Sequence, residues 1–152
     1  MDRKVYVTQA VYDELQAELA DIQQVRKPRL AQLLGSISGE IEPEDRSDAW
    51  LEEQMELLER RENELRQTLD AAEIVPKPDS HEKVAIGSTI TVDEDGARHT
   101  YTIVGSVGAD ADRGWITSES PLGAALLDRR EGDRVTVATP SGPRVVTLQR
   151  IE

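Results

Sequence analysis

The fold follows from one acidic stretch, Gly39-Glu-Ile-Glu-Pro-Glu-Asp-Arg-Ser-Asp48, which joins two long helical sequence patterns. The stretch holds five acids against one base, Arg46. Unpaired carboxylates are costly to remove from water, so a compact core could not enclose it. We therefore expect it to be the exposed turn of an antiparallel helical hairpin. The acids of this predicted tip are Glu40, Glu42, Glu44, Asp45 and Asp48.

Apolar residues recur at intervals of three and four on both sides of the tip, which is the spacing of a coiled-coil seam. Before the tip they are Leu15, Leu19, Ile22, Leu30, Leu33 and Ile37; after it they are Leu51, Leu58, Leu65 and Leu69, with Gln54 and Arg61 on the same face. Folding the arms together pairs Ile37 with Leu51, Leu33 with Gln54, Leu30 with Leu58, and Ile22 with Leu65. Each arm of about 28 residues would be roughly 40 Å long.

The first arm is interrupted at Arg26-Lys27-Pro28. Proline inside a helix removes a hydrogen bond and clashes with the preceding turn, which predicts a bend at Pro28. In the folded hairpin Arg26 falls opposite Arg61, so both need carboxylates such as Glu62 or positions at the seam edge.

Three residues mark the expected ends of the helices. Thr8 is a suitable N-cap, Gly39 a suitable C-terminal stop, and Pro43 a favoured first helical residue.

Beyond the hairpin the sequence predicts a small, mostly antiparallel β domain, and an α+β fold overall. We place the coiled-coil domain at 1–75, a proline-containing linker at 76–80, and the β-rich domain at 81–152. Alternating patterns predict strands over 84–92, 100–104, 114–118, 135–138 and 145–151. Ser120 and Pro121 are expected to start a short helix over 122–127.

Composition excludes several kinds of partner. The 152 residues carry a net charge of −12, and residues 9–73 alone contain seventeen acids and seven bases, a net −10. Such a surface argues against stable binding of duplex DNA or of an anionic membrane. The start of the chain has no apolar signal core, and cysteine is absent, as is common in the cytoplasm. A cytoplasmic monomer is expected.

Two regions of the chain, one near its start and one near its end, resemble the Gre-type (GreA/GreB-like) bacterial transcription factors in this order. Residues 8–30 follow the first helix of that family without gaps and include Val25-Arg26-Lys27-Pro28. Ser120-Pro-Leu-Gly-Ala-Ala-Leu-Leu127, Gly132-Asp133 and Thr139-Pro-Ser-Gly142 are similar to its C-terminal signature.

The resemblance implies a function. Members of the family bind RNA polymerase at the rim of its secondary channel through a C-terminal domain with an FKBP-like fold. Glu119, Ser120 and Pro121 match the segment that contacts a polymerase coiled coil. The hairpin enters the channel, and its acidic tip helps to hold a catalytic Mg²⁺ of the polymerase. The factor would then have no catalytic residues and no metal site of its own, and would share Mg²⁺ only with the polymerase.

The tip departs from the family motif, Asp-Leu-x-Glu-Asn-Ala-Glu-Tyr. Glu40-Ile41 replaces Asp-Leu, an extra residue enters the turn with Pro43, and Asp48 stands where the motif has its aromatic. A basic residue used near the RNA 3′ end falls on Glu52. Catalysis tolerates only small errors of placement, so we expect the tip to inhibit transcription. The alternative is an ordinary factor that stimulates transcript cleavage in backtracked polymerase.

Two hypotheses of other classes stay open at this point. An FKBP-like domain suggests prolyl isomerisation, which needs an aromatic-lined pocket, and residues 81–152 offer only Tyr101 and Trp115. A coiled-coil adaptor or chaperone would require apolar residues at the tip, where only Ile41 is available. His81 and His99 have no ligand spacing and are expected at the surface.

Overall fold

The computed structural model describes residues 4–37 and 46–152, which fall into two compact units. Residues 13–71 form a helical unit, and the residues up to Tyr12 form a second unit together with 72–152. The second unit therefore includes segments that we had assigned by sequence to the hairpin domain and the linker.

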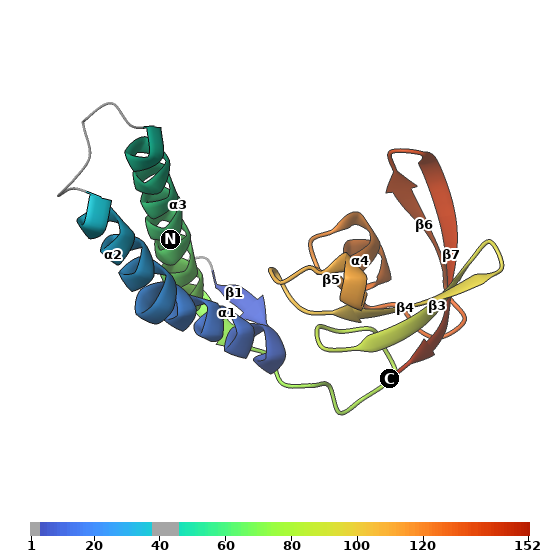
Figure 1. The fold of residues 1–152 in the computed structure, drawn as a ribbon. Coiled ribbons are helices and arrows are strands. Elements are labelled where there is room, and N and C mark those ends of the chain that lie inside the picture. The colour runs from blue at the N-terminus through green and yellow to red at the C-terminus, as the bar shows by residue number, and fades with distance from the viewer. Residues whose placement is uncertain (1–3, 38–45) are drawn as a thin grey trace. The chain divides into compact units, whose positions relative to one another are not determined.

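The helical unit is the predicted hairpin (Figure 1). Its first arm contains α1 (Gln9–Asp21, whose first residues belong to the other unit), a π-helical turn (Ile22–Arg26) and α2 (Lys27–Ile37). Its second arm is α3 (Arg46–Ala71), and α2 packs along it. The predicted helix ends at Gly39 and Pro43 lie outside the described residues, as do Glu40, Glu42, Glu44 and Asp45. Asp48 lies in the first turn of α3.

Burial along the hairpin follows most of the predicted seam. Ile22 and Leu65 are fully buried, and Leu30 and Leu51 are buried. Leu33 is the exception, because 48% of it stays exposed. Its predicted partner is Gln54, and the polar amide of this side chain does not provide the apolar surface needed to bury Leu33.

Just before Pro28, where the sequence predicts a bend, the structure has a π-helical turn. The Lys27 amide donates to the Ile22 carbonyl, five residues back instead of four. A regular helix would press the Pro28 ring against the carbonyl of Gln24, and the wider turn relieves that contact.

Salt bridges differ from the expected pattern at the interruption. Arg26 pairs with Asp21, and Arg61 pairs with Glu18. Both arginines thus find carboxylates, as expected, but neither uses Glu62. The Glu62 carboxylate forms salt bridges with Lys27 and Arg66 instead.

The second unit contains a five-stranded sheet in the order β5-β4-β3-β7-β6. The strands are β3 (Thr89–Glu94), β4 (Ala97–Ile103), β5 (Trp115–Ile116), β6 (Arg134–Thr139) and β7 (Gly142–Ile151). All neighbours are antiparallel except β4 and β5, so the predicted mostly antiparallel α+β architecture is confirmed. The strand predicted from residue 84 begins only at Thr89, because Ser88 Oγ accepts from the Ala85 amide and turns the chain there.

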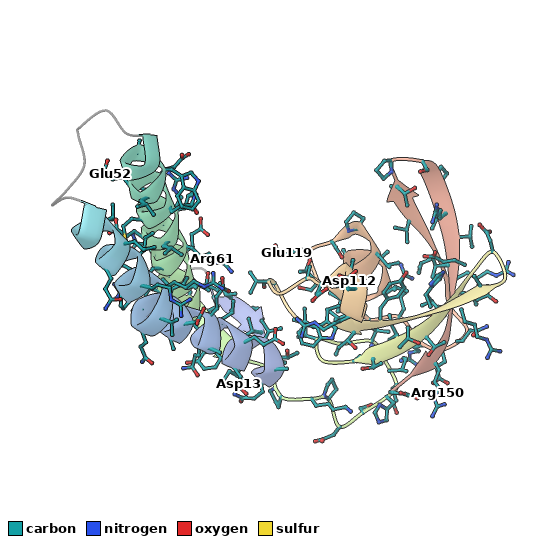
Figure 2. All side chains as sticks on the ribbon, in the orientation of Figure 1. Asp13, Glu52, Arg61, Asp112, Glu119 and Arg150 are labelled. Atoms are coloured by element: carbon teal, nitrogen blue, oxygen red, sulfur yellow. The ribbon has the colours of Figure 1, made fainter. Side chains whose placement is uncertain are left out.

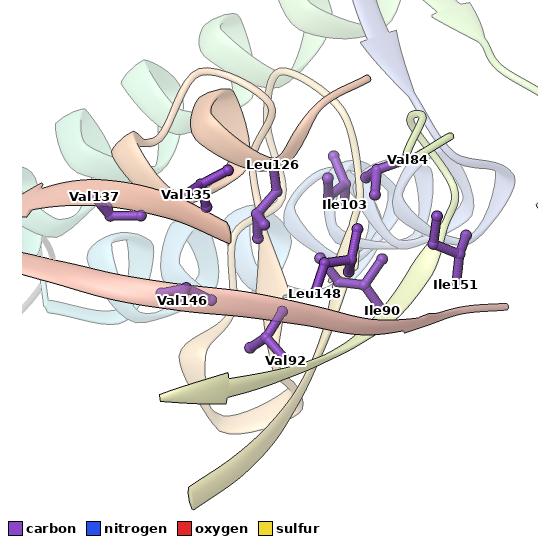
Figure 3. Close-up of a cluster of buried hydrophobic side chains, with 10 residues drawn as sticks. All are labelled: Val84, Ile90, Val92, Ile103, Leu126, Val135, Val137, Val146, Leu148 and Ile151. Atoms are coloured by element: carbon purple, nitrogen blue, oxygen red, sulfur yellow. The ribbon is translucent and has the colours of Figure 1, made fainter. Parts of the chain in front are cut away.

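One apolar cluster holds this sheet together (Figure 3). Leu126 from α4 (Pro121–Leu126) is fully buried and packs with Ile90, Ile103 and Leu148 of the sheet. The remaining members are Val84, Val92, Val135, Val137, Val146 and Ile151. All ten members of the cluster are aliphatic, and the chain contains no phenylalanine.

A separate two-stranded ribbon ties the start of the chain to the second unit. β1 (Val5–Val7) runs parallel to β2 (Ala72–Ile74), and Val7 also bridges to Gly105. Val7 is fully buried. Because this ribbon packs on the β unit, the compact units do not follow the predicted boundaries at 75 and 81.

Candidate functional site

The segment Glu119-Ser120-Pro121 forms the entrance to α4, and Ser120 is its N-cap as predicted. Ser120 Oγ accepts from the Gly123 amide at 3.1 Å and donates to the Thr117 carbonyl at 2.7 Å. The Ser120 amide donates to Thr117 Oγ1 at 3.1 Å. Pro121 occupies the first helical position, where its missing amide costs no hydrogen bond. Hydrogen bonds to Thr117 before it and to Gly123 after it therefore hold Ser120 in place.

Close packing beneath the segment adds to this rigidity. Gly123 is buried, and a Cβ placed on it would lie 2.0 Å from the Thr117 carbonyl oxygen. Only glycine permits that approach. Three residues further along, Leu126 anchors α4 in the core.

The outer side of the same segment is available to a partner. Glu119 and Pro121 are exposed and Ser120 is half-buried. Glu119 projects from the loop that leads into α4 (Figure 2). The structure therefore presents a carboxylate and a proline ring on a fixed backbone, an arrangement that costs little ordering entropy on binding.

A cation–π pair lies just before this segment in the chain, and the sequence analysis missed it. The Arg113 guanidinium lies 3.6 Å from the centre of the Trp115 ring, and Arg113 Nε donates to Asp110 Oδ2 at 2.7 Å. The hydrogen bond from Arg113 is the main cause that holds the pKa of Asp110 below its usual value. The sequence signal was the spacing Asp110-x-x-Arg113-x-Trp115 around a turn.

The aromatic residues considered for a prolyl isomerase pocket are engaged elsewhere. Tyr101 packs against the apolar core, and burial raises the pKa of its hydroxyl. Trp115 is covered by Arg113.

Four of the five acids of the hairpin tip lie outside the described residues. Glu52, which replaces a base of the family motif, is exposed on α3 near the tip (Figure 2). Within residues 4–37 and 46–152, no cluster of three or more His, Asp or Glu side chains is arranged to hold a metal ion. No helix in those ranges has the length and apolar composition needed to cross a bilayer.

A helical hairpin followed by a mixed sheet with a capped surface helix defines a class of two-unit α+β factors, and comparison identifies the family. Residues 79–152 match the family described as "Transcription elongation factor, GreA/GreB, C-term". The chain is 38% identical to the transcription elongation factor GreA of Chloroflexus aurantiacus, over 99% of this chain and 98% of the relative. It is 35% identical to GreA of Streptococcus gordonii, over 100% and 98%. The chain therefore belongs to the GreA/GreB family.

A solved structure is also similar in sequence. The GreA factor homolog 1 (Gfh1) of Thermus thermophilus is 26% identical over 99% of both chains, with a TM-score of 0.45.

Proposed function

We propose that this protein binds RNA polymerase through Glu119, Ser120 and Pro121, and regulates transcript elongation with the acidic tip of its hairpin. The observation that carries the docking step is the fixed, outward-facing segment at the start of α4. Membership of the GreA/GreB family supports the choice of partner. The reaction itself belongs to the active centre of the polymerase.

Inhibition is the direction that the tip residues favour. Glu40, Glu42, Glu44, Asp45 and Asp48 would share a Mg²⁺ ion with the polymerase, since hard cations prefer carboxylate oxygens. Stimulating cleavage also requires a steadied RNA end. Asp48 and the exposed Glu52 replace the aromatic and basic residues that would steady it, and a carboxylate repels the RNA phosphates. Occupying the site without that geometry blocks the polymerase.

Stimulation of transcript cleavage is the second candidate. It is favoured by the relatives, which are named transcription elongation factors and align with this chain end to end. Both candidates use the same docking segment, so they differ only in what the tip does.

The docking step is tested with Pro121→Arg, which places a bulky charge on the exposed face. We expect the affinity for purified bacterial RNA polymerase to fall at least tenfold while the circular dichroism spectrum is unchanged. Pro140→Arg, at an exposed proline in the turn between β6 and β7, is the matched control and should bind normally. Equal binding by the two variants would contradict the assignment of the segment.

The tip is tested by changing its five acids to serine and measuring RNA synthesis and RNA cleavage in the same reactions. Loss of inhibition with retained binding is expected. A control variant changes Glu53, Glu56 and Glu59, which are exposed acids of α3, and should still inhibit. Strong cleavage of backtracked RNA by the unmodified protein would replace the inhibitory assignment with the second candidate.

A further inference from the structure

The hairpin seam opens into an apolar groove between α2 and α3. It encloses about 290 Å³ and lies at the layer where Leu33 faces the position of Gln54. The groove is lined by Arg26, Arg29, Leu30, Leu33, Trp50, Gln54 and Leu58. Because glutamine replaces an apolar residue at this layer, the two helices leave the groove unfilled.

Two apolar side chains of the groove are exposed. Trp50 is 58% exposed and Leu33 is 48% exposed, although both border the seam. Tryptophan and arginine, which both line this pocket, are enriched at binding hot spots, and a partner side chain seated here would remove the Trp50 ring from water.

The rim of the groove carries positive charge on an otherwise acidic hairpin. Arg29 is exposed, and among the described residues no ion pair involves it. Arg26 is paired with Asp21 at 2.7 Å, and 57% of its side chain stays exposed. Since residues 9–73 carry a net −10, a local pair of arginines favours a partner with carboxylates at this place.

We propose that this groove is a second contact with RNA polymerase and accepts an apolar side chain flanked by carboxylates. The inference rests on the proposed function, because it names a further surface for the same partner. It differs from the docking segment in its place and chemistry: the groove lies in the helical unit and offers aliphatic packing with arginine pairing.

Protein fits the groove better than RNA does. Three leucines line it, and they match an aliphatic or aromatic side chain more closely than a stacked base. Two arginines are also too few to offset the repulsion between RNA phosphates and the surrounding acids.

The test measures binding of the full chain to purified RNA polymerase core enzyme, with and without RNA. Leu33→Ser removes the floor of the groove, and Leu57→Ser is its matched control, since Leu57 is 46% exposed on α3 but does not line the groove. Arg29→Glu reverses the rim charge, and Arg60→Glu reverses a comparably exposed arginine of α3.

We expect Leu33→Ser and Arg29→Glu each to raise the dissociation constant about tenfold with core enzyme alone, while the controls change it less than twofold. A photoreactive amino acid at position 33 should crosslink to a polymerase subunit. Groove variants that bind like their controls would overturn the inference. So would an effect seen only when RNA is present, or a wild-type dimer that Leu33→Ser dissociates.

The proposed function and this inference fail in distinguishable ways. If wild-type protein does not bind core enzyme, the proposed function fails. If wild-type protein binds and Pro121→Arg weakens it while the groove variants do not, only the groove assignment fails. Thermal unfolding of each variant checks that the hairpin is still folded. Because Leu33 and Arg29 are both exposed, we expect the variants to lose little stability.

Discussion

Arg61 and Glu18 form a two-point salt bridge that joins α3 to α1 across the hairpin. Arg61 Nε lies 2.8 Å from Glu18 Oε1, and Arg61 Nη2 lies 2.9 Å from Oε2. Arg61 also reaches Glu64 on its own helix at 3.4 Å. The paired geometry fixes the rotation of one arm against the other at a layer where the seam has a cation instead of an apolar residue.

This bridge predicts a pH-dependent contribution to stability. The hydrogen bond from Arg61 is the largest cause that lowers the pKa of Glu18 below its ordinary 4.5. A depressed pKa means that the stabilisation is present above about pH 4.5 and is lost as the pH falls through the folded value. Arg61 has a raised pKa, so it stays charged throughout this range. Glu18→Gln should cost about 0.2–1 kcal/mol at pH 7, since both groups are partly exposed.

Urea unfolding of Glu18→Gln and wild type at pH 7 and pH 3 checks this prediction. The difference between them should shrink at pH 3. Glu59→Gln, an exposed acid of α3, corrects for the change in net charge. A difference that persists unchanged at pH 3 would show that Glu18 acts through packing.

A second prediction concerns Glu62, which is only 7% exposed. Its Oε2 lies 3.2 Å from Lys27 Nζ but accepts no well-aligned hydrogen bond, and its Oε1 lies 3.2 Å from Arg66 Nη2. Removing one member of a buried charged group leaves the others desolvated without compensation. Lys27→Met should therefore destabilise the hairpin by about 1–3 kcal/mol, measured by urea unfolding.

The double variant gives the sharper result. With Glu62→Leu added to Lys27→Met, no charge of the pair stays buried, and most of the lost stability should return. A coupling energy above about 0.5 kcal/mol between the two sites is expected. Simple addition of the two single effects would mean that Arg66 alone neutralises Glu62.

The hairpin could be predicted from sequence because its signals are local and periodic. The spacing from Ile22 to Leu30 and the proline at 28 predicted both the seam and its bend. The π turn was not predictable, because the hydrogen bond from the Lys27 amide to the Ile22 carbonyl depends on how the first arm packs once Ile22 is buried. Likewise, the choice of Glu18 as partner of Arg61 depends on helix rotation, which the spacing alone does not fix.

The conformation of the docking segment, Glu119-Ser120-Pro121, could be predicted in part because its sequence signal is also local. A Ser-Pro pair predicts a helix start, and Ser120 caps α4 as expected. The ribbon of β1 and β2 was missed, since its strands are three residues each and lie more than sixty residues apart in the chain. The groove was missed because the spacing placed Leu33 in the seam, whereas 48% of it is exposed in the structure.

A third prediction follows from the contact beneath the docking segment. Gly123→Ala forces a Cβ against the Thr117 carbonyl and should displace the start of α4, with lower thermal stability and weaker polymerase binding together. Ser120→Ala removes only the cap and should cost about 1 kcal/mol. If Gly123→Ala were no more harmful than Ser120→Ala, the close approach would not be essential.

Gly105 is the residue that Val7 of the ribbon bridges to in the β unit. This residue has φ +111, and the Ser106 amide donates to the Tyr6 carbonyl at 2.7 Å beside it. A Cβ on Gly105 would lie 2.0 Å from the Tyr6 carbonyl oxygen, which is backbone and cannot swing away. Gly96 offers a matched comparison, because its φ is +86 and no atom lies within 4 Å of the corresponding Cβ.

Gly105→Ala should therefore destabilise the protein by more than Gly96→Ala. Both variants pay for a left-handed backbone, about 1–2 kcal/mol, but only Gly105→Ala also pushes β1 away from the loop that it bridges. The extra loss of stability in Gly105→Ala measures how much the packing of the ribbon contributes. Hydrogen exchange should become faster at the amides of Thr8, Val75 and Ser106, which donate hydrogen bonds across this junction. Equal losses of stability in the two variants, with unchanged exchange at those amides, would mean that the ribbon contributes nothing to holding the start of the chain on the β unit.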